Sequence, residues 1–137
     1  MIHTEFMRSS FWWWLFLLLL LVHSFFYKSL QATPLNIETR SYVHDPETGN
    51  FIYHNAMFSW DEMTLEGTEI SYNPEMNKAT AKGYVRFKRN KLLVVMDRLE
   101  LDLANNNGVF YNAILFDSQN RAYMTAEEVH WHGGSHF

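Results

Sequence analysis

The chain of 137 residues contains no cysteine. A disulfide framework, a thiolate nucleophile and a cysteine-ligated zinc site are therefore all excluded. The sequence also lacks a glycine-rich phosphate loop, and it shows no hydroxyl nucleophile with an attendant base. We therefore expect a protein that is not an enzyme, that needs no cofactor and that is stable through its hydrophobic core alone.

Positive charge is also scarce in this sequence. The formal net charge is −4 at pH 7, and beyond residue 35 nine Lys and Arg stand against fourteen Asp and Glu. Affinity for nucleic acid depends largely on the neutralisation of phosphates by Lys and Arg. Nucleic acid is therefore not an expected partner.

One long apolar run lies near the N-terminus, at residues 11–27. Signal peptides have apolar regions of about 7 to 15 residues, and spanning helices need about 17 to 25, so both a cleaved signal and a transmembrane anchor fit. In either case we expect the remainder of the chain to be exported. The predicted organisation is a cytoplasmic segment at 1–10, the anchor or signal at 11–27, a tether at 28–36, one β-domain at 37–132 and a tail at 133–137.

Turn-rich segments recur along the β-domain. They begin at Asp45, Asn73 and Asp102, so the spacings are 28 and 29 residues. Ten residues after each start stand, in order, Asn55, Gly83 and Asn112. A period of this length indicates a repeated supersecondary unit, which here is a β-hairpin.

Alternating apolar and polar residues predict the strands. The segment 98–103 places three leucines on one face and three charged residues on the other. Segments 92–96 and 109–116 are apolar on both faces, which indicates strands that are covered on both sides or that face a ligand trough. We predict a bulge near Met96–Asp97. The predicted strands are 37–44, 50–58, 64–72, 78–88, 91–103, 108–117 and 121–131, and the predicted fold is an all-β jelly roll or hairpin sandwich.

The order and spacing of three segments resemble the OstA-like domain of the lipopolysaccharide-transport (Lpt) family. These segments are Thr68–Pro74, Ala79–Phe87 and Asp97–Asp102. Two later segments, Gly108–Ala113 and Tyr123–Val129, are most similar to the periplasmic N-terminal domain of the family member LptD. The outer-membrane barrel of LptD has no counterpart in the sequence, and an anchored jelly roll without a barrel has the architecture of LptC. A relative without a barrel and a fragment of a longer gene both remain open.

The resemblance implies a β-jelly roll in the periplasm of a Gram-negative bacterium that takes part in lipopolysaccharide assembly at the outer membrane. Its implied partners are the acyl chains of lipid A and other Lpt-type jelly rolls, which it meets by β-strand augmentation, while the N-terminal segment contacts the membrane. The alternatives are a structural scaffold that holds no lipid and a carbohydrate-binding module. A carbohydrate-binding module would need exposed aromatic residues, for which only Trp60 and Trp131 are candidates.

Two sets of residues are candidates for these contacts. The inward apolar set predicts a lipid trough, or alternatively a closed core, and consists of Val85, Phe87, Leu93, Val95, Leu99, Leu101, Val109, Tyr111 and Leu115. The strands at 37–44 and 121–131 contain no proline to block pairing at a sheet edge. We predict that the second edge docks a partner through Tyr123, Thr125, Val129 and Trp131.

Polar clusters offer weaker candidates. Glu100 and Asp102, with Asp97 nearby, form a pair of the kind that glycosidases use. Because these carboxylates alternate with leucines, we interpret them as a solvated outer face. His130, His132 and His136 share a spacing that suits a metal ion. At a glycine-containing terminus we expect only adventitious metal binding there.

Overall fold

The computed structural model describes residues 34–133. The predicted segments at 1–10 and 11–27, most of the tether and most of the tail lie outside the described residues, and so does His136. Between residues 34 and 133 there is no helix long and apolar enough to cross a membrane.

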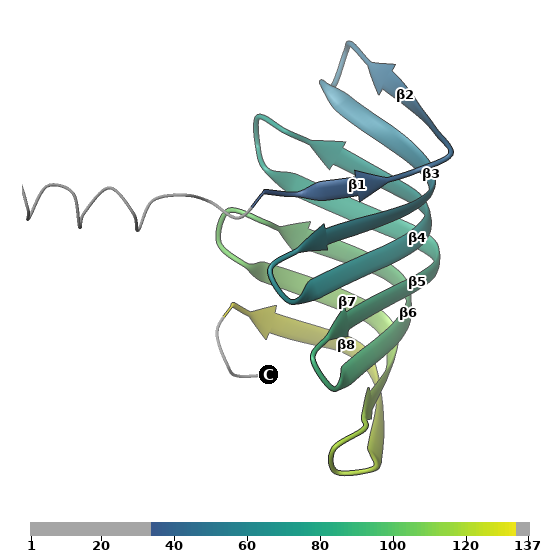
Figure 1. The fold of residues 1–137 in the computed structure, drawn as a ribbon, viewed down its shortest axis with the longest axis vertical. Coiled ribbons are helices and arrows are strands. Elements are labelled where there is room, and N and C mark those ends of the chain that lie inside the picture. The colour runs from purple at the N-terminus through teal and green to yellow at the C-terminus, as the bar shows by residue number, and fades with distance from the viewer. Residues whose placement is uncertain (1–33, 134–137) are drawn as a thin grey trace, which may run out of the picture. The chain divides into compact units, whose positions relative to one another are not determined.

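The described residues form one antiparallel sheet, which confirms the predicted all-β fold (Figure 1). Its order is β1-β3-β4-β5-β6-β7-β8, with β2 also paired to β3. The strands are β1 (Asn36–Glu38), β2 (Ser41–Asp45), β3 (Asn50–Trp60), β4 (Met63–Asn73), β5 (Lys78–Arg89), β6 (Leu92–Asp102), β7 (Asn107–Asp117) and β8 (Ala122–His132).

The predicted first strand is interrupted. Both β1 and β2 pair with β3 in one continuous register, in which Glu38 lies opposite Met57 and Ser41 lies opposite His54. Between them, the Thr39 hydroxyl donates to the carbonyl oxygen of His54 at 3.0 Å. The other six predicted strands agree with β3 to β8 to within two residues at each end.

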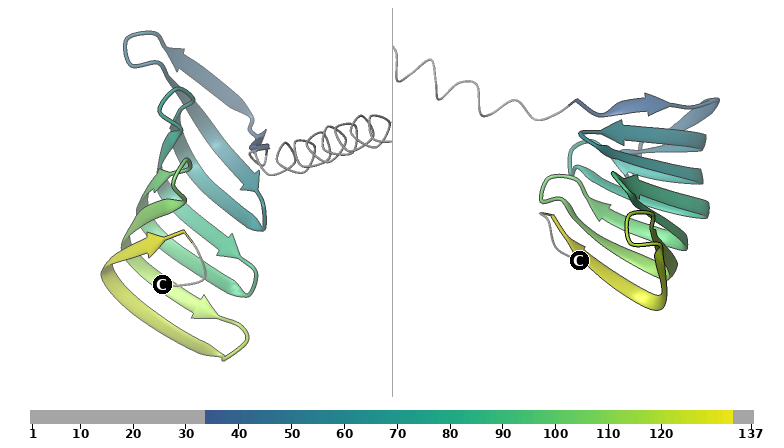
Figure 2. Two further views of the ribbon diagram at one scale, coloured as in Figure 1. Left: turned by 90° about the vertical axis from the view of Figure 1, so that its left-hand side faces the viewer. Right: turned by 60° about the horizontal axis from the view of Figure 1, so that its bottom comes forward.

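A line of backbone irregularities crosses the middle of the sheet. Asn55 in β3, Gly83 and Tyr84 in β5, and Asn112 in β7 have φ angles of 48°, 74°, 49° and 50°. The register shifts along β4–β5 and β5–β6 at the same level. The bulge predicted near Met96–Asp97 lies on the neighbouring strand instead, because Gly83 and Tyr84 of β5 stand opposite the single residue Asp97 of β6. The β6–β7 ladder keeps its register across this level. Bulges bend strands, so the sheet bends along this line (Figure 2).

The bend divides the sheet into two arms. Arm A consists of residues 41–54, 69–82, 98–111 and 128–132, and arm B consists of residues 36–38, 56–67, 85–95 and 113–126. Each arm is a row of hairpins whose turns lie at its tip. We call the side of the domain where the two rows of tips face each other the seam. The period of 28 to 29 residues is thus the distance from one arm A hairpin to the next.

The core lies between the two arms. No polar or charged residue of the described part is buried, and the largest fully buried side chains include Trp131, Phe58, Phe87 and Phe110. Aromatic rings meet across the space, because Phe87 of arm B lies 5.4 Å from Phe110 of arm A. Each large apolar side chain stabilises the fold by about 1.5–3 kcal/mol when buried.

The arm A turns are held by their first residue. The carboxylates of Asp45 and Asp102 accept the backbone N–H groups of Glu47 and Asn105, at 3.0 Å and 3.2 Å. Side-chain hydrogen bonds from Thr48 to Asp45 and from Asn105 to Asp102 are the main reason why the pKa of each carboxyl lies below its ordinary value. The side chain of a short polar residue thus replaces missing backbone partners in the turn.

Candidate functional site

Five of the nine predicted trough residues line the space between the arms. They are Val85, Phe87, Leu99, Leu101 and Leu115, and all are buried. They come from β5, β6 and β7, which lie in the centre and the C-terminal half of the sheet (Figure 1). The sheet therefore gathers these residues on one inner apolar face, as the alternation predicts.

The other four predicted trough residues lie on the outer face, which corrects their assignment. They are Leu93, Val95, Val109 and Tyr111, and each is the neighbour of a buried residue such as Val94 or Phe110. The inward positions of β6 change from even to odd numbers at the bend, and those of β7 change likewise. A prediction that continues one alternation along a whole strand therefore assigns half of that strand to the wrong face of the sheet.

The outer face of arm A is polar. The guanidinium carbon of Arg98 lies 4.1 Å from the centre of the Tyr111 ring, and the Tyr111 hydroxyl is 3.3 Å from a Glu100 carboxylate oxygen. The Asn112 side chain donates to Asp97 at 2.9 Å. The carboxylates considered as a catalytic pair thus have structural partners on an exposed surface.

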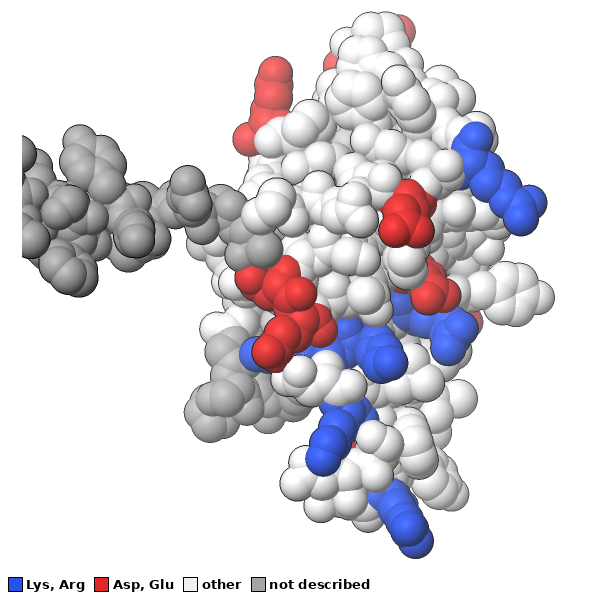
Figure 3. Space-filling view, in the orientation of Figure 1, with Lys and Arg blue, Asp and Glu red and all other residues white. Residues whose placement is uncertain are grey.

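The outer face of arm B is apolar towards the C-terminal edge. Leu93 of β6 lies opposite Phe116 of β7, which lies opposite Tyr123 of β8, and Val95 lies opposite Ile114. All except Leu93 are exposed. Lys and Arg side chains gather over the lower part of the face seen in Figure 3. Segments 92–96 and 109–116, which are apolar on both faces, thus place one face in the core. Their other face contributes to an exposed apolar patch.

Strand β8 forms the C-terminal edge of the sheet within the described residues, since it pairs with β7 alone. Tyr123 is 78% exposed and Thr125 is also exposed, so both are accessible to a partner. Trp131 is buried in the core, so its predicted role as an edge contact is wrong. Val129 is partly buried and packs against the core. The N-terminal edge exposes Tyr42 and Val43.

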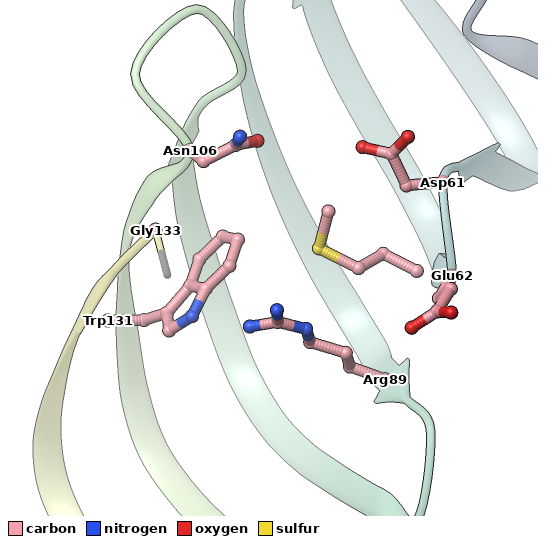
Figure 4. A pocket seen from close by; sticks show the side chains of 7 residues that line it. Asp61, Glu62, Arg89, Asn106, Trp131 and Gly133 are labelled. Carbon is pink, nitrogen blue, oxygen red and sulfur yellow. The ribbon is translucent and has the colours of Figure 1, made fainter. Parts of the chain in front are cut away.

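A pocket of about 500 Å³ opens at the seam between the tips of the two arms (Figure 4). Arm B supplies Asp61, Glu62, Met63 and Arg89, and the arm A side supplies Asn106, Trp131 and Gly133. The sequence gives no signal for this pocket, because its residues lie in four separate turns and strand ends that only the bend brings together.

The histidines form no metal centre in the described part of the chain. His130 Nε2 hydrogen-bonds to a carboxylate oxygen of Glu128. Among residues 34–133 no three His, Cys, Asp or Glu side chains lie close enough together to hold a metal ion.

Comparison with solved structures identifies the same fold in LptH from Pseudomonas aeruginosa, described as the LptA-homologous periplasmic component of the conserved lipopolysaccharide transport device. The TM-score is 0.53 and the identity is 12%, and the match covers 69% of this chain and 83% of that chain. No family model and no curated protein matches the sequence. The likeness shows that the described residues have the fold of an Lpt jelly roll.

Proposed function

We propose that this chain is a periplasmic jelly roll that binds the acyl chains of lipopolysaccharide between its two arms and takes part in lipopolysaccharide transport. The observation that carries the proposal is the fold that the chain shares with LptH, a periplasmic component of a lipopolysaccharide transport device. The proposal includes export to the periplasm of a Gram-negative bacterium, contact with the membrane through residues 11–27, and the absence of catalysis.

The chemistry of the inner face supports an acyl ligand. Apart from the indole N–H groups of Trp60 and Trp131, the buried side chains between the arms carry no polar atom. A hydrocarbon chain can therefore replace their contacts without breaking a hydrogen bond. Strand pairing joins only neighbours in the sheet, and in the described residues no backbone ladder ties the tips of arm A to those of arm B. Acyl chains can therefore enter when the arms part at the seam.

The open edges support transfer between domains of the same fold. An edge strand has unpaired N–H and C=O groups that can pair with a strand of another domain. Docking at β8 would extend the sheet, and with it the inner apolar face, into the next jelly roll. The bound amphiphile would then move along a continuous apolar surface.

Site-specific photocrosslinking tests the proposal, because adjacent residues of β6 point to opposite faces. Leu101 is buried between the arms, and Glu100 lies on the outer face. We expect a photoreactive residue at Leu101, or at Phe87 in β5, to label lipopolysaccharide more strongly than one at Glu100. Equal labelling at the three positions would contradict lipid binding between the arms.

A second candidate function is a structural domain that docks partner strands and holds no lipid. The observation that favours it is the burial of large side chains in the inner space, those of Phe58, Phe87, Phe110 and Trp131. Mass spectrometry of the protein purified from its native envelope separates the two functions. Lipid A that stays with the parent protein, but not with a Leu101→Arg variant, would contradict the scaffold.

A further inference from the structure

The seam pocket contains a buried donor without a partner. Trp131 is 1% exposed, and its indole Nε1 has no hydrogen-bond partner. The guanidinium carbon of Arg89 lies 6.0 Å from the centre of the Trp131 ring. Figure 4 shows the indole nitrogen on the side of the ring that faces the Arg89 guanidinium. Two groups that can only donate therefore face the same space.

A second buried indole lies close by. Trp60 ends β3 immediately before Asp61 of the pocket, and its Nε1 also lacks a hydrogen-bond partner. Trp60 and Trp131 lie 6.3 Å and 5.5 Å from the same ring, that of Phe87. Burial of an N–H group without an acceptor is unfavourable, so the seam is suited to a ligand that brings acceptor oxygens.

We propose that the seam pocket binds the phosphate group of an amphiphile, with the Trp131 indole and the Arg89 guanidinium as its donors. Arg89 carries five N–H donors, so it can bind a phosphate oxygen in addition to the interactions that it already makes. The pocket volume of about 500 Å³ suits a phosphorylated head group. The inference rests on the proposed function in one respect, which is that the phosphate belongs to a bound lipid. Acyl chains between the arms would place the head group of that lipid at the seam.

The opposite wall of the pocket determines which phosphate fits best. Asp61 and Glu62 come from the β3–β4 turn and supply two carboxylates, while Asn106 adds an uncharged amide. The two carboxylates disfavour a bare phosphate dianion and favour a phosphate that is joined to an amine. The expected order of affinity is phosphatidylethanolamine, then phosphatidic acid, then inorganic phosphate.

The indole N–H of Trp131 can be observed directly by nuclear magnetic resonance. The full chain in an uncharged maltoside detergent contains five tryptophans, and a Trp131→Phe variant assigns the relevant indole signal. The probes are dihexanoyl phosphatidylethanolamine, dihexanoyl phosphatidic acid and inorganic phosphate, with octyl glucoside as the amphiphile that lacks phosphate. We expect the phosphatidylethanolamine to shift the Trp131 signal and octyl glucoside to leave it unchanged.

Charge-matched variants identify the cation. Arg89→Gln should weaken the binding of the phosphatidylethanolamine about tenfold, the loss expected for one hydrogen bond to a charged group. Arg121→Gln removes the same charge at a hairpin tip outside the pocket and should leave the affinity unchanged. If Arg89→Gln does not fold, Arg89→Lys keeps the charge but loses the planar donor pair, and it should still weaken binding.

The outcomes distinguish this inference from the proposed function. If lipopolysaccharide labels Leu101 but no phosphate probe moves the Trp131 signal, the seam site is wrong and the proposed function stands. If the probes move the signal but lipopolysaccharide labels Leu101 and Glu100 equally, the seam site stands and the proposed function is wrong. Equal affinities for inorganic phosphate and both lipids would overturn the head group as the ligand and indicate a site for free phosphate.

Discussion

Trp131 packs its indole 5.5 Å from the ring of Phe87, although the two residues come from β8 and β5, which do not pair in the sheet. The contact joins the C-terminal end of arm A to the tip of arm B. It depends on side-chain packing, so the seam can open without breaking a backbone ladder. The same residue therefore stabilises the closed domain and presents its indole N–H to the seam pocket.

Replacement of Trp131 by Ala should destabilise the domain strongly. Loss of a buried tryptophan ring costs about 3–5 kcal/mol of unfolding free energy. Tyr123→Ala is the matched control, because Tyr123 belongs to the same strand and is 78% exposed, and its effect should lie within about 0.5 kcal/mol. Urea unfolding followed by circular dichroism measures both. Similar losses in the two variants would show that the contact between the arms contributes little.

The bend should be sensitive to a methyl group at Gly83. Its φ is +74°, and an added Cβ would lie 2.9 Å from the Cβ of Thr68 on the adjacent strand. Backbone strain alone costs about 1–3 kcal/mol, so Gly83→Ala should lower the unfolding free energy by at least about 1 kcal/mol. Gly67→Ala provides a control with an ordinary φ and no contact below 3.3 Å. An equal or smaller loss at Gly83 would contradict the strained bend.

The neighbouring residue should respond in the opposite direction. Tyr84 has a φ of 49° and is 90% exposed, so a bulky side chain occupies a strained backbone position without gaining burial. Asn tolerates this conformation better than Tyr does. We expect Tyr84→Asn to raise the unfolding free energy by about 0.5–1 kcal/mol in the same urea experiment. A destabilised variant would indicate that the phenol makes a contact that outweighs the strain.

The strands and arm A turns could be predicted because their signals are local. Alternation fixes a strand, and Asp45, Asn73 and Asp102 can each hydrogen-bond a nearby backbone N–H in a turn. Asp117 forms a turn of the same kind at the tip of arm B, where the backbone N–H of Gln119 donates to it at 2.8 Å. That turn belongs to a second series, in which the strands before the arm B turns end at Trp60, Arg89 and Asp117, with the same spacings of 29 and 28 residues. The repeat was recognised from the arm A series that begins at Asp45, so it did not reveal the arm B series.

The two faces of the sheet could not be assigned by alternation alone. The recurrence of Asn55, Gly83 and Asn112 is visible in the sequence, but their positive φ angles, and therefore the bend, are not. The bend reverses the alternation, which is why Val95 was predicted to lie inside and is exposed. The position of Trp131 in the last strand of the sheet predicts an edge contact, although its ring reaches across the core to Phe87.

Acid should weaken the domain through its turns. The pKa values of Asp45, Asp102 and Asp117 lie below the ordinary value, chiefly because of hydrogen bonds from Thr48, Asn105 and the backbone of Gln119 respectively. A carboxyl whose pKa is lower in the folded state stabilises that state above its unfolded pKa of about 4, and the stabilisation is lost as the pH falls through the folded value.

A triple variant can remove the three carboxyl groups and keep an acceptor oxygen in each turn. Its substitutions are Asp45→Asn, Asp102→Asn and Asp117→Asn, and the new side chains do not titrate. We expect its unfolding free energy to fall less than that of the parent between about pH 5 and pH 2. Thermal unfolding across this range measures the difference. Parallel pH profiles would show that these three turns do not cause the acid sensitivity.

Association through the C-terminal edge can be tested with proline. Within the described residues β8 pairs on one side only, and Met124 and Thr125 are both exposed there. In an antiparallel edge strand, consecutive residues direct their N–H groups alternately to the paired neighbour and to the open side. Proline at one of the two positions therefore removes a donor from the open edge and spares the β7–β8 ladder, while proline at the other removes a ladder bond.

Of the two variants Met124→Pro and Thr125→Pro, one should keep the unfolding free energy of the parent. We predict that this variant will lose association with other jelly rolls, including a second copy of the chain. Docking through main-chain hydrogen bonds requires a continuous open edge, and proline both removes a donor and obstructs the approach of a strand. Sedimentation of the full chain at increasing concentration and pull-down of a jelly-roll partner measure the loss. Proline at Arg40, in the interruption between β1 and β2, is the control for the opposite edge. If a folded β8 proline variant associates as strongly as the parent, docking does not use this edge.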